Sequence, residues 1–184
     1  MYPILRLSLH MLRNRGASTI QHTDEVVTEH MCWPVDLDFF FEMNNGRILT
    51  LYDIGRMILS QRNGTLNVLK ERRWGMVVAG SSVRYRKRLR CFQKFTVHTR
   101  AIGWDDKFLY IEQSMWNRKG ECTSNVLIRT CVTNRKGMVP MKDALEAWGM
   151  PLESPPLPEW TKCWIEADSH RPWPPELASA HVRA

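Results

Sequence analysis

The chain has 184 residues, 43% apolar and 24% charged, which is the composition of an ordinary globular protein and not of a disordered one. No apolar run approaches the roughly 20 residues that a membrane-spanning helix needs, so no such span is expected. The net charge of +7 favours polyanionic partners, which include nucleic acid, an anionic lipid surface and phosphate-bearing small molecules.

The cysteines bear on the cellular compartment, and the cysteines and histidines together bear on metal binding. The five cysteines include no C-x-x-C pair, which predicts free thiols in a reducing cytoplasm. The six histidines are scattered, and no His/Cys cluster has the spacing of metal ligands. We therefore expect neither a metal nor a cofactor.

Residues 1–22 are expected to form a basic amphipathic helix followed by a linker. Arg6 and His10 interrupt the apolar stretch that a secretory signal peptide requires. In a helix, three leucines share one face and three basic residues share another: Leu5, Leu9 and Leu12 against Arg6, His10 and Arg13. Two interpretations stay open: residues 1–15 lie on an anionic membrane surface, or the helix docks on its own domain or on a dimer partner.

Residues 23–33 have β character and end at Pro34, and a helix is predicted over residues 46–62. Its apolar positions leave only a narrow polar stripe, which is typical of a buried helix. Asn44 or Asn45 is expected to cap its start, and Asn63-Gly64 to stop it.

The following segment predicts an antiparallel sheet. Strands are expected over residues 74–91, 95–104, 107–116 and 123–133, the first bent near Gly80. Residues 141–148 are expected to form a short closing helix. One long helix and one such sheet bury each other's apolar faces most simply if the sheet wraps around the helix, so residues 23–150 predict an α+β domain of this kind.

Residues 151–184 contain seven of the ten prolines, together with Trp160, Trp164 and Trp173. Prolines at this density block helices and central strands. We expect a Pro/Trp-rich tail, either pinned to the domain by its tryptophans or flexible beyond residue 170.

Several segments resemble one family. VDLDFFFEMNNGRILTLYDIGR resembles the entry to the central helix in the 4-hydroxybenzoyl-CoA thioesterase-like branch of the hotdog superfamily, whose pattern is D-x-D-x-x-x-H-x-N-N-x-x-Y. WGMVVAGSSVRYRKR and AIGWDDKFLYIEQSMW are similar to motifs of its thioesterase-superfamily-member-6-like group. The resemblance covers roughly residues 20–150. The pattern falls on Asp36, Asp38, Glu42, Asn44 and Asn45, with Ile48 in the aromatic slot.

This resemblance implies a hotdog fold in which two sheets join in a homodimer or higher homo-oligomer. It also implies active sites at subunit interfaces and metal-free hydrolysis of an acyl-CoA substrate. The alternative is a catalytically weak acyl- or lipid-binding protein, peripheral to membranes through residues 1–15.

Thioester hydrolysis needs a carboxylate and donors for the developing oxyanion, and a helix N-terminus offers free N–H groups. The resemblance makes Asp38 the base or nucleophile, whereas an aspartate in such a loop also commonly caps a turn. Glu42, where relatives have histidine, is a second acid/base candidate or a solvated surface residue. Asn44, Asn45 and Gly46 are candidates to bind the substrate carbonyl, or simply to cap the helix.

The segment SVRYRKRLR predicts a basic stripe, because alternation in a strand places Arg84, Arg86, Arg88 and Arg90 on one face. The first three are candidates to bind the phosphates of coenzyme A. The alternative is a solvated face partly neutralised by Glu112. Nucleic acid is not an expected partner, because the aromatic residues follow core-like strand alternation.

Overall fold

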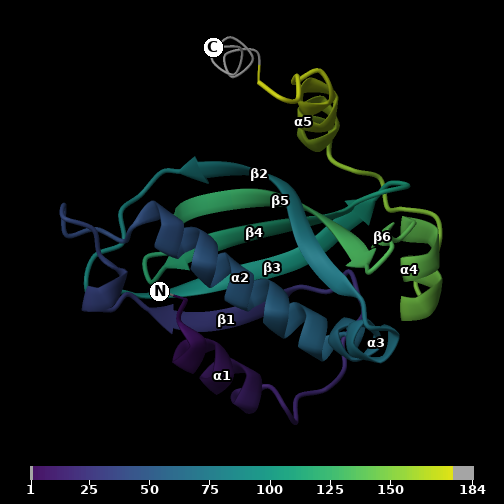
Figure 1. Cartoon of the computed structure of the whole chain (residues 1–184). Helices are drawn as coiled ribbons and strands as arrows, with labels where there is room; N and C mark the ends of the chain where they lie inside the picture. Colours follow the sequence, from purple (N-terminus) through teal and green to yellow (C-terminus); the bar gives the residue numbers. More distant parts are fainter. Residues whose placement is uncertain (1, 176–184) are drawn as a thin grey trace, which may run out of the picture.

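The computed structural model describes residues 2–175 and has the predicted α+β architecture. The strands are β1 (Val26–Met31), β2 (Gly75–Tyr85), β3 (Lys94–Trp104), β4 (Leu109–Asn117), β5 (Cys122–Asn134) and β6 (Gly137–Met138). The helices are α1 (Ile4–Arg13), α2 (Asn45–Arg62), α3 (Thr65–Arg72), α4 (Met141–Trp148) and α5 (Glu159–Ser169), with a 3-10 turn η1 (Pro34–Asp36). The sheet is antiparallel in the order β1-β3-β4-β5-β2, and β6 pairs with β5 (Figure 1).

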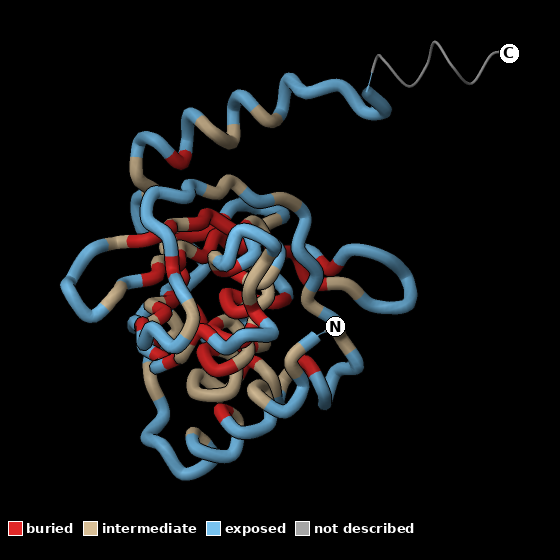
Figure 2. Tube along the Cα trace, turned by 90° about the vertical axis from the view of Figure 1, so that its left-hand side faces the viewer, coloured by how far each residue is buried: buried red, intermediate tan, exposed pale blue. Residues whose placement is uncertain are grey.

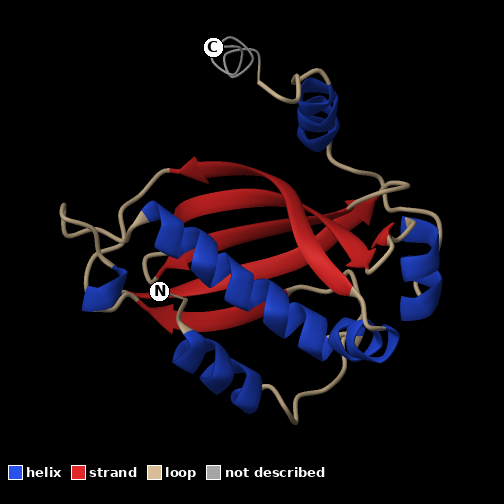
Figure 3. Ribbon diagram, viewed as in Figure 1, coloured by secondary structure: helices blue, strands red, loops and turns tan. Residues whose placement is uncertain are grey.

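Helix α2 lies across the concave face of this curled sheet, which confirms the predicted central helix (Figure 3). Leu51, Ile54 and Ile58 are fully buried between helix and sheet, where the buried residues gather in Figure 2. The approach is close at Gly55, since a Cβ added there would lie 2.5 Å from the Thr99 hydroxyl oxygen. The apolar periodicity of this segment therefore identified the element around which the core is built.

Strand β2 bends as predicted but ends earlier. Its register against β5 shifts between Val78 and Gly80, which confirms the expected irregularity at this glycine. The strand ends at Tyr85, however, and the next two backbone N–H groups, of Arg86 and Lys87, both donate to the carbonyl of Thr123. The predicted stripe of four arginines on one strand face is therefore wrong, because only Arg84 belongs to the strand.

Two helices were not predicted. Helix α3 occupies residues that the sequence assigned to no element, and its few apolar positions explain why periodicity missed it. Helix α5 lies in the proline-rich tail but uses a proline-free window, with Pro158 at the N-cap position where a missing N–H costs nothing. Proline density blocked a helix only where the prolines themselves lie.

The tail is anchored through Arg129 of β5. The Arg129 guanidinium forms a 2.7 Å ion pair with Asp168 and lies 5.2 Å from the ring centroid of Trp164. Trp160 and Trp173 are exposed, so of the three tryptophans Trp164 makes the anchoring contact. The flexibility expected beyond residue 170 falls largely on residues 176–184, which lie outside the described residues. The division into 1–22, 23–150 and 151–184 stays a prediction.

Helix α1 docks on its own domain, beside β1 and α2 (Figure 1). Leu7 and Met11 pack against the core, and His10 is buried. The leucines expected to form its apolar face point outward instead: Leu5, Leu9 and Leu12 are 88%, 48% and 68% exposed. Within residues 2–175, no helix is long and apolar enough to cross a membrane.

Candidate active site

The loop before α2 folds back on itself as a short hairpin. The Asn44 N–H donates to the Asp36 carbonyl over 2.9 Å, Leu37 bridges Met43, and the Asp38 N–H donates to the Glu42 carbonyl over 2.8 Å. The hairpin therefore holds Asp38 opposite Glu42. This pair lies two positions farther along the hairpin than the Asp36–Asn44 pair at the start of α2. At the strand rise per residue, the two pairs are roughly 7 Å apart.

Asp38 is held by the turn that it helps to form. Its Oδ1 accepts hydrogen bonds from the N–H groups of Phe40, at 2.9 Å, and Glu42, at 3.4 Å. This is the turn-capping role that the sequence left open. Its Oδ2 has no hydrogen-bond partner among the described residues. The turn thus orients the carboxylate and leaves one oxygen available.

Glu42 is not a freely solvated residue. Its carboxylate forms a 2.9 Å ion pair with Arg88, and its backbone bridges Arg90. The neighbouring N–H of Met43 donates to the carbonyl of Leu89. The loop therefore joins the segment that follows β2, and Arg88 lies beside the two candidate carboxylates.

The start of α2 has the expected cap. The side-chain oxygen of Asn44 accepts from the N–H groups of Gly46, at 2.9 Å, and Arg47, at 3.3 Å. Of the first three N–H groups of the helix, only that of Asn45 lacks a hydrogen-bond partner within residues 2–175. Asn44 therefore caps the helix, and the Asn45 N–H is the donor left for a ligand.

A cavity of about 370 Å³ opens at this helix end. It includes Asn44 and Gly46 but neither Asp38 nor Glu42. Its lining residues come from the N-terminal segment, the loop and α2: Tyr2, Val35, Asp36, Leu37, Asn44, Gly46, Arg47 and Thr50. In the single chain, the candidate carboxylates and the helix-end cavity are therefore neighbours and not one pocket.

Asp36, the first aspartate of the family-like pattern, has a structural role. Its buried carboxylate binds the guanidinium groups of Arg6, at 2.8 Å, and Arg47, at 3.0 Å, and the N–H of Trp33, at 2.9 Å. Because all three come from different elements, this one carboxylate fixes α1, η1 and α2 relative to one another.

Tyr2 is a wall residue that sequence reasoning missed. Its hydroxyl donates a 2.7 Å hydrogen bond to Asp53 of α2, and burial, followed by Asp53, raises the pKa of Tyr2 above its usual range. Asp53 also pairs with Arg56, which donates to Gln113 beneath the helix. Tyr2 and Asp53 are 51 positions apart, and no local pattern signals such a contact.

Arg84 and Arg86 lie away from the loop. They line a groove of about 970 Å³ on the sheet face opposite α2, together with Arg100, Trp160 and Trp164. The structure thus brings Asp38, Glu42, Asn44, Asn45, Gly46 and Arg88 to one end of the molecule and leaves Arg84 and Arg86 elsewhere.

The tip of the hairpin is apolar and exposed, which the sequence did not single out. Phe39, Phe40 and Phe41 are 81%, 67% and 77% exposed, and the first two rings lie 4.1 Å apart. Three adjacent exposed phenylalanines form the kind of apolar patch that marks a binding or assembly surface.

Comparison with known proteins assigns a family. Residues 32–165 match the family model described as the Thioesterase-like superfamily. The curated Protein THEM6 of Xenopus laevis is 36% identical over 133 residues, which cover 72% of this chain and 63% of that protein. The matched part is thus less than two thirds of that relative's length.

Two solved structures share the fold. A probable thioesterase from Escherichia coli superposes with a TM-score of 0.62 at 16% identity, over 66% of this chain and 94% of that chain. A hypothetical protein from Staphylococcus aureus in complex with CoA gives 0.58 at 12% identity, over 77% and 94%. From its sequence match and its fold, the chain belongs to the Thioesterase-like superfamily of hotdog proteins.

Proposed function

We propose that this protein is a cytoplasmic acyl-CoA thioesterase that works as a homodimer or higher homo-oligomer. The observation that carries the proposal is the Asp38 carboxylate, oriented by two backbone N–H groups, on a hairpin that leads directly into the N-terminus of α2. Membership of the Thioesterase-like superfamily supports thioester hydrolysis. The CoA bound to the similar Staphylococcus aureus protein supports coenzyme A as the thiol.

In the proposed reaction, Asp38 attacks the thioester carbonyl carbon or takes a proton from the water that attacks it. Negative charge then develops on the carbonyl oxygen. The Asn45 N–H and the positive end of the α2 dipole stabilise this charge, with Asn44 and Gly46 shaping the helix end. The C–S bond breaks, and coenzyme A leaves as the thiol after taking up a proton, with Glu42 as the second acid/base candidate. If water attacks, the carboxylic acid product forms directly; if Asp38 attacks, water then hydrolyses the mixed anhydride on Asp38, which releases the acid and restores the carboxylate.

Phosphate recognition is assigned to the arginines. Arg84 and Arg86 form no ion pair with any other residue in the described part of the chain, but they line the groove on the opposite face of the sheet, so they would bind the phosphates only of a coenzyme A that extends into that groove. Arg88 is occupied by Glu42 at 2.9 Å and would exchange that carboxylate for a phosphate. Because Arg88 lies beside the loop, it is the arginine best placed for substrate bound there.

The dimer would complete the site. β2 is the last strand of the sheet on its side, which leaves one edge of backbone N–H and C=O groups open for pairing. The exposed Phe39–Phe41 tip offers apolar surface either to a second subunit or to an acyl chain. We therefore place the missing wall between Asp38 and the helix-end cavity in the partner subunit.

The direct test follows release of free thiol from a panel of acyl-CoA thioesters of different chain lengths and aromatic character. Turnover of at least one substrate well above its rate in buffer is the expected result. Stoichiometric binding of acyl-CoA without turnover would instead favour the alternative, a catalytically weak acyl- or lipid-binding protein. That alternative is supported by the absence of Asp38 from the lining of the helix-end cavity.

A further inference from the structure

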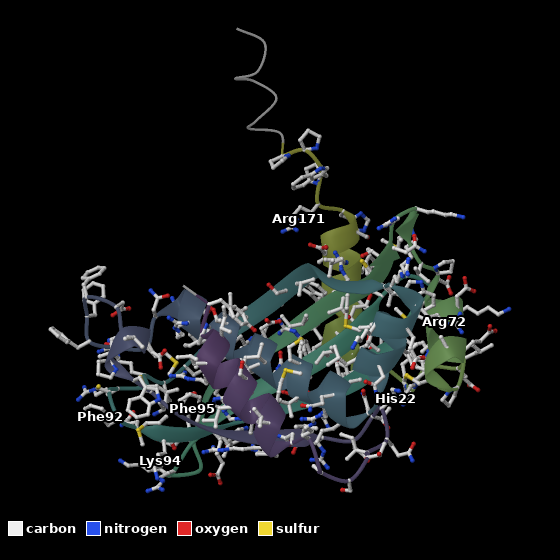
Figure 4. The ribbon with its side chains drawn as sticks, turned by 60° about the horizontal axis from the view of Figure 1, so that its bottom comes forward. His22, Arg72, Phe92, Lys94, Phe95 and Arg171 are labelled. Atoms are coloured by element: carbon white, nitrogen blue, oxygen red, sulfur yellow. The ribbon has the colours of Figure 1, made fainter. Side chains whose placement is uncertain are left out.

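A second cavity, of about 480 Å³, lies between α1 and the edge of the sheet, on the side of the molecule seen in Figure 4. We call it the α1 cavity. It is lined by the inner side of α1, the outer residues of β1 and β3, and the turn after β4. Lys94 and Phe95, both labelled in Figure 4, come from the start of β3 and belong to its wall.

Two neighbouring histidines form the floor of the α1 cavity. The rings of His10 and His30 lie 4.4 Å apart, and His30 also stacks on Phe95 at 5.5 Å. Burial is the main cause that lowers the pKa of both, and it brings that of His30 to about 3. The floor is therefore uncharged at neutral pH, and the buried Nδ1 of His30 has no hydrogen-bond partner in the structure of residues 2–175.

The rim carries an excess of positive charge. Arg13, Lys94 and Arg118 line the α1 cavity, are exposed, and form no ion pair with other residues of the described chain. Arg6 also lines it, but its charge is taken by Asp36. The carboxylate among the lining residues is Glu29. Three unpaired cations around one carboxylate leave a site suited to a phosphate anion.

The apolar side of α1 borders this rim. Leu9 lines the cavity, and Leu5 and Leu12 project beyond it into solvent. On the surface of the helix, the face formed by these leucines lies next to Arg13. A ligand that satisfies both surfaces has a phosphate beside an apolar layer, as in the headgroup region of a bilayer.

We propose that the α1 cavity binds the phosphate headgroup of an anionic phospholipid while Leu5 and Leu12 enter the adjoining acyl layer. Arg13, Lys94 and Arg118 hold the phosphate from three different elements. Trp33, which lines the same cavity and is exposed, lies at the interface, where tryptophan is favoured. This assigns a built site to the membrane contact, in place of a helix that acts by its own amphipathicity.

The test is co-sedimentation of the full chain with vesicles of phosphatidylcholine alone and of phosphatidylcholine with phosphatidylserine. We expect binding only to the anionic vesicles, and a loss of at least about tenfold in the Arg13→Glu/Lys94→Glu variant. The control is Lys107→Glu/Lys136→Glu, which makes the same change of charge at turns that line no part of the cavity. Equal losses in the two variants would mean general electrostatic attraction and would overturn the site.

A second pair of variants tests the apolar contribution. Leu5→Ser/Leu12→Ser is expected to weaken vesicle binding severalfold without changing the fold, because both leucines are already exposed. Leu152→Ser, at another exposed leucine, is the control. The lipid proposal fails if inorganic phosphate occupies the cavity and the leucine variants bind vesicles normally. It also fails if those variants change only the self-association of the chain in sedimentation velocity.

Discussion

Arg6 donates a 2.8 Å hydrogen bond to the buried carboxylate of Asp36, 30 positions away in the chain. The other carboxylate oxygen pairs with Arg47 at 3.0 Å. The N-terminal helix therefore supports the candidate site, because the same carboxylate holds the hairpin that carries Asp38. Tyr2 adds a second tie between the N-terminal segment and α2.

Asp36→Asn is expected to destabilise the fold by about 3 kcal/mol or more, because it removes the buried negative charge that pairs with the largely buried guanidinium groups of Arg6 and Arg47. Urea unfolding measures the change. The control is Glu146→Gln in the exposed Lys142–Glu146 pair, for which about 0.5 kcal/mol or less is expected. Similar small losses in both variants would show that Asp36 does not hold the segments together.

Gly55→Ala is expected to cost about 1–3 kcal/mol although alanine is the better helix former. The new Cβ would lie 2.5 Å from the Thr99 hydroxyl oxygen and 2.9 Å from the Gln113 side-chain nitrogen, so either α2 or these hydrogen-bonded side chains must shift. Gly16→Ala is the matched control, because no atom lies within 4 Å of a Cβ there. A neutral or stabilising Gly55→Ala would contradict the close approach of helix and sheet.

His30 makes stability depend on pH. Burial, followed by the positive charges nearby, lowers its pKa from 6.5 to about 3. Below pH 6.5, His30 therefore binds a proton in the unfolded chain but not in the folded chain. The free energy of unfolding falls as the pH is lowered from 6.5 to about 3. The slope from this one group is at most about 1.4 kcal/mol per pH unit.

Replacing this histidine isolates its contribution. His30→Gln keeps a side chain able to hydrogen bond Thr28, which His30 contacts at 2.8 Å, but removes the titration. We expect its free energy of unfolding to fall less than that of the parent chain between pH 6.5 and 4. Parallel curves for parent and His30→Gln would refute a neutral buried imidazole.

The elements predicted well are those with strong local signals. Residues 46–62 have continuous apolar periodicity and an asparagine cap, and the helix found there spans Asn45–Arg62. The strand ends were less predictable, since β2 stops where the chain turns toward Thr123 and the hairpin before α2. That turn depends on backbone pairing between distant segments, which alternation along SVRYRKRLR does not encode.

The candidate site shows the same division. Family-like spacing pointed to Asp38, Glu42 and the asparagines, and the fold gathers these at one end of α2. The ion pair of Glu42 with Arg88 and the contact of Tyr2 with Asp53 needed the fold, because each joins segments far apart in sequence. In residues 151–184, the number of prolines wrongly predicted that no helix forms, whereas α5 occupies a stretch between prolines.

The most direct test compares thiol release by the parent chain and by the Asp38→Asn variant, after confirming that both have the same unfolding midpoint. Asparagine retains an oxygen to accept the Phe40 N–H, so the turn should survive while the base or nucleophile is lost. We predict a fall in kcat/KM of at least about 100-fold with an unchanged unfolding midpoint. Asp24→Asn, which alters a turn carboxylate that accepts the Gln21 N–H, should remain fully active. Equal rates for the parent chain and Asp38→Asn would contradict the proposed chemistry.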